Sequence, residues 1–454
     1  MYRRAHVYLK EYFSKSQAKP LVLRGARQVG KSTLVKSFCA VEGYHECRIN
    51  LEEIKFKSLD LPDIDVQRFL EEVELETRHN LNDPKTILFI DEIQAQPNAL
   101  KYLRYLYEQR PGLKIISAGS LLEFALSDIE YSAPVGRINY FHLGPMSFSE
   151  FLLALNETSL SEKLKNPFRI SELAHEKLSR FYKYYLFIGG MPEAVKTYSE
   201  TKSLLQVMEV HRSLLETYRD DFLKYTKNSS YERVHKIFDY VPTSLGKKIR
   251  YSEIDRDEKS RDLKRAVELL INARILMPVF HTQGTKSPIK ALRDEDIFKL
   301  YFVDVGLAAS INRISWDQIQ SDNGEELLLL GQLHEQFIAQ HLWYRENGLL
   351  TPDLYYWLRD RSSAKAEVDF IIDNEQKPLP IEVKTQGGRM KSLFVFMAEK
   401  KLKKALKFGN TFPSKNNVTY KIKNKETPTT VNFELISLPH YCVEWLYTAE
   451  AKTP

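Results

Sequence analysis

The chain has 454 residues, of which 43% are hydrophobic and 28% are charged, with a formal net charge of +6. This length exceeds one ordinary hydrophobic core, so we expect roughly two to four domains. No apolar run approaches the roughly 18 residues that span a bilayer, and the N-terminus lacks the order of a secretory signal. These features predict a cytoplasmic protein with no membrane partner. The mild positive charge permits nucleic-acid binding without requiring it.

The three cysteines are odd in number and have no CxxC spacing: Cys39, Cys47 and Cys442. This pattern argues against a disulfide framework and against a zinc site, and it predicts reduced thiols.

A glycine-rich loop lies near the start of the chain, between the apolar residues 20–24 and a helix-like stretch. Strand, glycine loop and helix in this order suit phosphate binding. Backbone N–H groups can surround phosphate, the helix N-terminus adds positive potential, and a lysine neutralises the β- and γ-phosphates. We therefore expect an ATP site with Lys31 as its catalytic lysine and Ser32 as a Mg²⁺ ligand. Its nucleotide-binding residues would be Gly25, Ala26, Arg27, Gln28, Val29, Gly30, Lys31, Ser32 and Thr33.

Residues 85–92 form a continuous apolar run that ends in two acids, as expected of a buried parallel strand. Asp91 would hold Mg²⁺ through water, and Glu92 would polarise the water that attacks the γ-phosphate. The alternative is that both acids are solvated and cap the next helix. The chain has no DxxG pattern at this point and no NKxD signature elsewhere, so ATP is preferred over GTP.

Two further strands, residues 113–118 and 138–143, would complete the sheet. Ser120 follows the first of them, where it could sense the γ-phosphate or serve as an ordinary helix N-cap. Arg137 precedes the second. In ring-forming ATPases with an additional-strand core, this position carries an arginine finger that acts on a neighbouring subunit. A finger role for Arg137 implies a homo-oligomer; the alternative is a surface or salt-bridged arginine.

The middle of the chain reads as helices rich in Leu, Phe and Tyr, broken once at residues 189–193. Its position predicts a helical lid over residues 151–228. Glu193 stands where such lids often carry an arginine, which argues against a lid-borne arginine sensor. Residues 231–283 then read as three helices and a hairpin, which predicts a winged helix. Four of its basic residues could face a DNA duplex, unless the module serves only for packing: Lys259, Arg261, Lys264 and Arg265.

The last third carries acids in unusual places. Glu335 points toward the apolar face of a helix expected over residues 324–347, and Asp369 lies inward on a strand over 368–372. Glu382 and Lys384 share one face of a strand over 380–384. Restriction-type nucleases use such a set, in which the carboxylates bind one or two Mg²⁺ and the lysine orients water. We therefore predict Glu335, Asp369 and Glu382 as metal ligands, with Asp369, Glu382 and Lys384 as catalytic residues.

A basic helix is expected to follow this set and could track a phosphate backbone, although a run of lysines is also typical of a solvated face. Its basic residues are Arg389, Lys391, Lys400, Lys401, Lys403, Lys404 and Lys407.

Taken together, these stretches resemble a family of prokaryotic AAA-type ATPases with a C-terminal domain of unknown function that has the PD-(D/E)XK nuclease-like fold. The similarity covers nearly the whole chain. The matching stretches are RGARQVGKSTL, ILFIDEIQ, AGSLL, GRI with HLGPMSFSEF, YLFIGGMPEAV, KLYFVDVGLAA, residues 331–338, and EVDF with IEVK. One departure is Ala118, where relatives often carry threonine.

The resemblance implies an α/β multidomain protein. A P-loop AAA-type parallel-sheet core would occupy residues 1–150 and the helical lid residues 151–228. A winged-helix domain would span 229–310, and a restriction-endonuclease-like α/β domain would span 311–454. It supports functional roles for Lys31, Ser32, Asp91, Glu92, Asp369, Glu382 and Lys384.

These features predict a Mg²⁺-dependent ATPase that acts on or with nucleic acid, DNA rather than RNA, and that carries a nuclease-like domain. A second hypothesis is a nucleotide-controlled assembly switch whose nuclease-like domain only binds a partner. Glu92 and the additional domains disfavour a third hypothesis, a small-molecule kinase.

Overall fold

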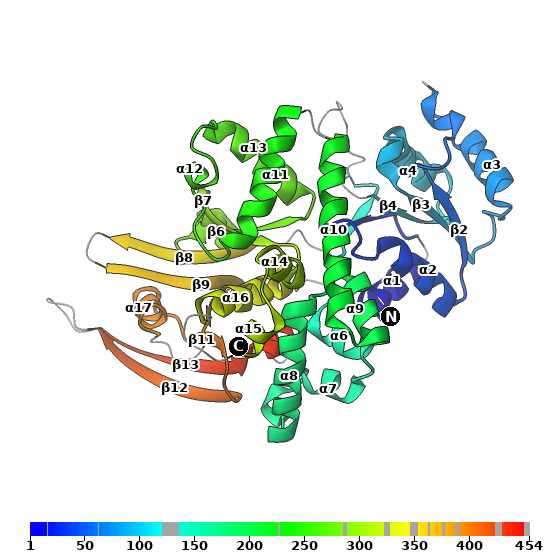
Figure 1. Cartoon of the computed structure of the whole chain (residues 1–454). Helices are drawn as coiled ribbons and strands as arrows, with labels where there is room; N and C mark the ends of the chain where they lie inside the picture. Colours follow the sequence, from blue (N-terminus) through cyan, green and yellow to red (C-terminus); the bar gives the residue numbers. More distant parts are fainter. Residues whose placement is uncertain are drawn as a thin grey trace.

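The computed structural model describes residues 1–15, 17–61, 63–119, 136–225, 228–284, 288–321, 327–345, 353–361, 364–374, 377–385, 390–422 and 429–448. Two β-sheets lie on opposite sides of the molecule, and helices, including the long α10 (Leu204–Tyr225), fill the space between them (Figure 1). None of the helices in these ranges is long and apolar enough to cross a membrane.

The N-terminal sheet has five strands in the order β2-β3-β4-β1-β5, and every neighbouring pair is parallel. The strands are β1 (Leu21–Arg24), β2 (His45–Asn50), β3 (Thr86–Asp91), β4 (Lys114–Ala118) and β5 (Asn139–His142). All four apolar runs expected as strands are present, each trimmed by one or two residues. The strand β2 was not expected, because its sequence HECRIN is largely polar.

Helices cover both faces of this sheet: α1 (Ala5–Phe13), α2 (Lys31–Glu42), α3 (Val66–Thr77) and α4 (Asn98–Gln109). Leu21 and Leu23 belong to the hydrophobic cluster that includes α1 and α2, whereas Val22 belongs to the cluster that includes α3 and α4. Successive side chains of a strand point to opposite faces, so a sheet covered on both sides needs apolar residues at every position. This explains why all six residues of β3 are buried.

The order of strands places the additional strand β4 between β1 and β3. The chain leaves β1 toward β2 on one side of the sheet, whereas β5 lies on the other side of β1. Ligands of open α/β sheets bind at such a switch point, outside the carboxyl ends of the strands. The glycine loop begins at this end of β1. Ser120, which follows β4, lies outside the described residues.

A helical segment follows the sheet: α6 (Phe148–Ala154), α7 (Thr158–Lys163), α8 (Glu172–Ile188), α9 (Pro192–Thr201) and α10. The expected break falls between α8 and α9. Gly189 there has a φ of +74°, and a Cβ at this position would lie 2.0 Å from Oδ1 of Asp304. Only glycine combines this backbone conformation with so close a contact.

The next segment contains α11 (Asn228–Thr243), α12 (Tyr251–Ile254), α13 (Ser260–Asn272) and an antiparallel hairpin of β6 (Leu276–Thr282) and β7 (Arg293–Phe302). These are three helices and a hairpin in the expected order. The hairpin is not a separate wing, however. Strand β6 also pairs in parallel with β8 (Leu354–Arg361), which joins the hairpin to the C-terminal sheet.

The C-terminal sheet has eight strands in the order β12-β13-β11-β10-β9-β8-β6-β7. Its other strands are β9 (Ala364–Asn374), β10 (Lys377–Val383), β11 (Lys404–Gly409), β12 (Ser414–Ile422) and β13 (Thr429–Pro439). The remaining helices are α14 (Val305–Ile311), α15 (Trp316–Gln320), α16 (Leu327–Trp343), α17 (Lys391–Lys400) and the 3-10 segment η5 (His440–Tyr447).

The basic helix expected over residues 389–407 is shorter than predicted. It ends at Lys400, because Lys401 adopts a left-handed conformation with a φ of +54°. Lys404 and Lys407 lie on β11 instead, where the buried Ala405, Leu406 and Phe408 hold the segment between β10 and β13. Arg389 lies outside the described residues. The basic residues therefore do not form one helical face.

Candidate functional site

The glycine loop curls between the end of β1 and the start of α2. Gln28 and Gly30 have φ values of +60° and +92°, so both adopt left-handed backbone. A Cβ at Gly25 would lie 2.1 Å from the carbonyl oxygen of Leu143. Glycine at this position therefore lets the loop approach the end of β5 closely.

Lys31 and Ser32 begin α2 at the mouth of this loop. Lys31 is 7% exposed, and its Nζ donates to the carbonyl oxygens of Gly25 (3.0 Å) and Ala26 (2.9 Å). Ser32 Oγ donates to Oδ2 of Asp91 over 2.8 Å. The structure thus brings together the serine and the aspartate that were predicted to hold Mg²⁺. A hydroxyl beside a carboxylate is a donor set of the kind that Mg²⁺ prefers, so these residues fit the ion.

Arg48 is a neighbour of Asp91 that the sequence analysis missed. It lies on β2, and its Nη2 is 2.7 Å from Oδ2 of Asp91. Strand β2 pairs with β3 in parallel, so the side chains at their ends converge. The polar sequence of β2 was the signal that could have indicated this contact.

Glu92 follows Asp91 with a left-handed backbone, at a φ of +48° and a ψ of +48°. Its Oε2 accepts a hydrogen bond from Nε2 of Gln94 over 2.6 Å. A non-glycine residue in this conformation costs about 1–2 kcal/mol, and such strain is common at functional sites. The left-handed turn at Glu92 follows the end of β3 at Asp91, and the hydrogen bond from Gln94 holds the Glu92 carboxylate in place.

Arg137 pairs with Glu108 of α4, with Nε 2.8 Å from Oε1, and its side chain is about half exposed. It precedes β5, which runs parallel to β1. Arg137 therefore lies at the amino edge of the sheet, whereas the glycine loop lies at the carboxyl edge. Four strand residues at about 3.3 Å each separate these edges by about 13 Å. A finger role for Arg137 would thus require a neighbouring chain, and the chain by itself forms the salt bridge.

Helix α10 contacts the glycine loop from the helical segment. Nη1 of Arg27 is 2.8 Å from Oδ2 of Asp221, which is 1% exposed, and the Tyr218 hydroxyl donates to the carbonyl oxygen of Arg27 over 2.7 Å. A Cβ at Gly30 would lie 3.4 Å from Cγ of Pro192, the first residue of α9. The helices predicted to form a lid therefore lie directly on the loop.

Arg3 contacts the same loop from the N-terminus of the chain. It is 8% exposed, and it donates to the carbonyl oxygens of Val29 (2.9 Å) and Gly144 (2.7 Å). Its Nε lies 3.2 Å from Oε2 of Glu150 on α6. No pattern in the sequence indicates this role, because only the folded chain brings residue 3 to the loop.

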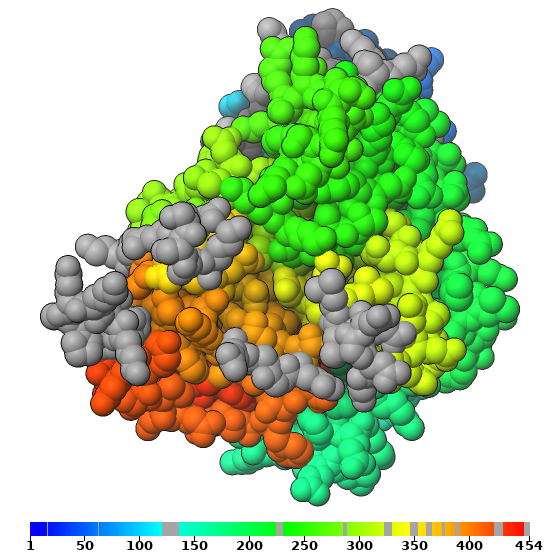
Figure 2. All heavy atoms as spheres, turned by 60° about the vertical axis from the view of Figure 1, so that its left-hand side comes forward, coloured from blue at the N-terminus to red at the C-terminus, as the bar shows by residue number. Residues whose placement is uncertain are grey.

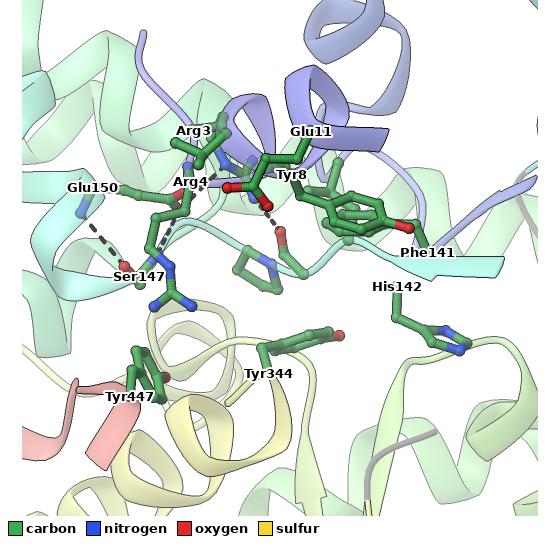
Figure 3. A pocket seen from close by; sticks show the side chains of 15 residues that line it. Arg3, Arg4, Tyr8, Glu11, Phe141, His142, Ser147, Glu150, Tyr344 and Tyr447 are labelled. Atoms are coloured by element: carbon green, nitrogen blue, oxygen red, sulfur yellow. Dashed lines mark hydrogen bonds and ion pairs between the residues drawn. The ribbon is translucent and has the colours of Figure 1, made fainter. Parts of the chain in front are cut away.

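A cavity of about 320 Å³ adjoins Arg3 (Figure 3). Arg4 and Tyr8 border it from α1 and the residue before it, and Tyr344 and Tyr447 border it from the C-terminal part. The Arg4 guanidinium lies 4.3 Å from the ring centroid of Tyr447, a cation–π distance. The cavity thus marks where the nucleotide-binding sheet and the C-terminal elements meet.

The C-terminal acids also come together. Glu335 lies on α16, Asp369 on β9 and Glu382 on β10, and each acts electrostatically on another of the three. Nζ of Lys384 is 2.6 Å from Oε1 of Glu382, so this pair shares one face as predicted. Oδ2 of Asp369 accepts from the backbone N–H of Val383 over 2.7 Å. We call Glu335, Glu367, Asp369 and Glu382 the carboxylate cluster.

Burial is the largest cause of the raised pKa values in this cluster. It raises the pKa of Glu335 to about 8, and the charge of Asp369 adds to this effect. Burial and Asp369 likewise raise the pKa of Glu382 to about 8. Burial also raises the pKa of Asp369, against the opposing effects of Lys299 and Lys384. Oε2 of Glu382 is buried without a hydrogen-bond partner in the described structure.

Three members of this neighbourhood were not predicted from the sequence. Lys299 of β7 is 1% exposed and forms an ion pair with Glu367 of β9. The Tyr301 hydroxyl donates to Oε2 of Glu335 over 2.9 Å. Period-two spacing places Lys299 and Tyr301 on one face of β7, and Glu367 beside Asp369 on one face of β9. That spacing was visible in the sequence, but the packing of β7 on α16 was not.

In the parts of the chain that the structure describes, no three His, Cys, Asp or Glu side chains are arranged to hold one metal ion. The carboxylates are instead engaged by Lys299, Tyr301, Lys384 and a backbone N–H. As placed, the carboxylate cluster does not fit a metal. Metal binding by Glu335, Asp369 and Glu382 stays a prediction.

The basic residues of α13 and of its N-cap position divide into two groups. Lys264 pairs with Asp296 at 3.2 Å, and Arg261 lies 3.7 Å from its neighbour Asp262. Lys259 and Arg265 are exposed. DNA contact by this helix stays a prediction.

The three cysteines are buried and free, in agreement with the expectation of reduced thiols.

The parallel sheet, the glycine loop and the joined Ser32 and Asp91 define a P-loop nucleotide-binding domain. Comparison with known families agrees, since residues 17–152 match the AAA domain. Residues 179–318 match a domain of unknown function, DUF8612, and residues 330–441 match another, DUF4143. The chain therefore contains an AAA domain, a class with ATPase activity, followed by two regions whose families have no described function.

No curated protein matches the chain. Among solved structures, the chain is similar to the structure of C. elegans PCH-2, with 15% sequence identity and a TM-score of 0.27. The match covers 45% of this chain and 64% of the PCH-2 chain, so this chain spans less than two thirds of that protein. A similarity of this size supports no conclusion about fold or function.

Proposed function

We propose that the chain binds Mg²⁺ and ATP at the glycine loop and hydrolyses ATP there. The observation that carries this proposal is the hydrogen bond between Ser32 and Asp91, with Glu92 adjacent. Ser32 and Asp91 would hold Mg²⁺, which supplies charge neutralisation to the phosphates when bound. Lys31 would exchange its two carbonyl partners for phosphate oxygens. Glu92 would orient the attacking water and accept its proton.

A Glu92→Gln variant tests this assignment. It should bind ATP as tightly as the parent chain, because the amide retains the shape and leaves Lys31, Ser32 and Asp91 in place. Its turnover should fall at least about a hundredfold, since general-base catalysis contributes roughly that much. Binding is measured by calorimetry and turnover by phosphate release. Glu71→Gln, an exposed residue on α3, is the matched control. Unchanged turnover in Glu92→Gln would show that another group activates the water.

The conformational effect of ATP binding would pass from the glycine loop to the helices that contact it. Arg27 and Tyr218 tie it to α10, and Arg3 ties it to Glu150 on α6. The start of α6 in turn holds Glu444 of η5, which accepts from the Ser149 N–H over 2.6 Å. Phosphate binding at the loop would therefore shift helices that also contact the C-terminal part. This supports an ATPase whose turnover moves the C-terminal part, and Arg137 would complete the site of a neighbouring copy.

We propose as a second function the Mg²⁺-dependent cleavage of nucleic acid, DNA in preference to RNA, by the C-terminal part. This function would require the carboxylate cluster to leave the arrangement described above before it holds Mg²⁺. The specific observation is that Glu335, Asp369, Glu382 and Lys384 gather at one place although they come from a helix and two strands. Figure 2 shows a hollow between the green α11–α13 segment and the orange C-terminal strands, which adjoins the elements that carry these residues.

Plasmid nicking in Mg²⁺ and ATP tests this second function. The parent chain should nick or degrade DNA, and Lys384→Ala should lose this activity because the remaining acids cannot orient water without the ammonium. Lys177→Ala changes an exposed residue on α8 (Glu172–Ile188) that has no assigned role, and this variant should cut like the parent. If no DNA or RNA is cut by the parent chain, the C-terminal part would be a binding module instead.

A further inference from the structure

Lys299 is the most deeply buried charge next to the carboxylate cluster. It lies on β7, in the hairpin that was expected to belong to a winged helix, and only 1% of it is exposed. It forms an ion pair with Glu367, and its charge also acts on Glu335 and Asp369. A single ammonium from one edge of the eight-stranded sheet thus faces acids from α16 and β9.

The surroundings keep this ammonium charged. Burial by itself opposes a charged lysine, but the carboxylates of Glu335, Glu367 and Asp369 outweigh burial and raise the pKa of Lys299. A buried cation of this kind is tolerated only where carboxylates compensate it. Conversely, four acids gathered in one place need positive charge. In the described structure this charge comes from Lys299 and Lys384.

The packing around the cluster leaves Glu335 little freedom. A Cβ at Gly246, in the turn between α11 and α12, would lie 2.4 Å from Oε2 of Glu335. The same oxygen accepts the hydrogen bond from Tyr301. Glu335 is thus held by the segment between α11 and β7, and among the described residues no three carboxylates are placed to hold one metal ion.

We propose that Lys299 is a built-in cation of the carboxylate cluster, which neutralises the acids in place of a divalent ion and keeps the nucleotide-free chain from binding metal there. This inference rests on the second proposed function, because it concerns the same acids. The proposal also gives a function to the pairing of the β6–β7 hairpin with the C-terminal sheet. Strand β7, which carries Lys299, packs on α11, and α11 packs on α10. A displacement of β7 would withdraw the cation from the acids.

The test is Mn²⁺ binding to the full chain without nucleotide, measured by electron paramagnetic resonance. Lys299→Met alone would leave the cluster, including the buried Asp369, without this cation and could unfold the protein. The informative variant is therefore Lys299→Met with Glu367→Gln, which removes the ion pair as a neutral unit. We expect this double variant to bind one more Mn²⁺ per chain than the parent, at least tenfold more tightly than any binding by the parent. Adding Glu382→Gln should abolish the gain.

Two controls make the result specific. Lys264→Met with Asp296→Asn removes an exposed ion pair between α13 and β7 and should leave Mn²⁺ binding unchanged. Thermal unfolding should show that the double variant is folded. The proposal is overturned if the parent chain already binds Mn²⁺ in a manner that Glu382→Gln abolishes, or if the folded double variant gains no ion. Failure of the nuclease function would look different: the double variant would bind Mn²⁺, but DNA would remain intact.

Discussion

Lys31→Ala should reduce ATP turnover by at least about a hundredfold. The ammonium is nearly buried and held over the loop by two carbonyl oxygens, so its position is fixed before nucleotide arrives. In a site shielded from water, a preorganised cation stabilises the charge that develops on the phosphates. Removal of one such group costs about 3 kcal/mol of transition-state stabilisation, a factor of roughly a hundred or more.

The measurement is steady-state phosphate release in Mg²⁺, beside ATP affinity by calorimetry. Lys36→Ala provides the matched control, because Lys36 is exposed on the same helix α2 and its removal should leave turnover within about twofold of the parent. Equal turnover by Lys31→Ala and Lys36→Ala would contradict the assignment of the loop as the site of hydrolysis.

Asp304→Ala should lower the free energy of unfolding by about 3–5 kcal/mol, the range for breaking a buried polar network around a charge. Asp304 is fully buried at the start of α14. Its carboxylate accepts from the backbone N–H groups of Gly190 (2.7 Å), Gly306 (3.0 Å) and Leu307 (3.1 Å), and from Nε2 of Gln340 (3.3 Å). Alanine would leave these donors unsatisfied.

The change in unfolding free energy is measured with urea, and Asp317→Ala is the control because Asp317 is exposed on the neighbouring helix α15. Asp317→Ala should stay within about 0.5 kcal/mol of the parent. Asp304 joins the break between α8 and α9 to α14 and α16. A loss below about 1 kcal/mol in Asp304→Ala would therefore show that these elements are held together by apolar packing alone.

The nucleotide site was predictable because its signals are local. Residues 20–33 encode a strand, a tight loop and the start of a helix in one continuous stretch. The unbroken apolar run that ends at Asp91 predicts that β3 is buried. The contact between Ser32 and Asp91 joins residues 59 positions apart. It follows from the rule that parallel strands present their carboxyl ends at one edge.

The contacts around these sites were not predictable from local pattern. Arg3 reaches the loop from the N-terminus, and Lys299 reaches the carboxylate cluster from a strand that was expected to belong to another domain. Period-two spacing indicates which side chains share a face, but not which element that face will meet. The same limit explains why the hairpin β6–β7 was expected as a separate wing, although it extends the C-terminal sheet.

The most direct test of the account is the rate of ATP turnover by the full chain with no nucleic acid, with single-stranded DNA and with double-stranded DNA, beside Lys31→Ala. We predict Mg²⁺-dependent phosphate release that at least one form of DNA stimulates and that Lys31→Ala abolishes under every condition. Turnover that neither form of DNA changes would contradict a DNA-linked ATPase, and turnover that persists in Lys31→Ala would contradict hydrolysis at the glycine loop.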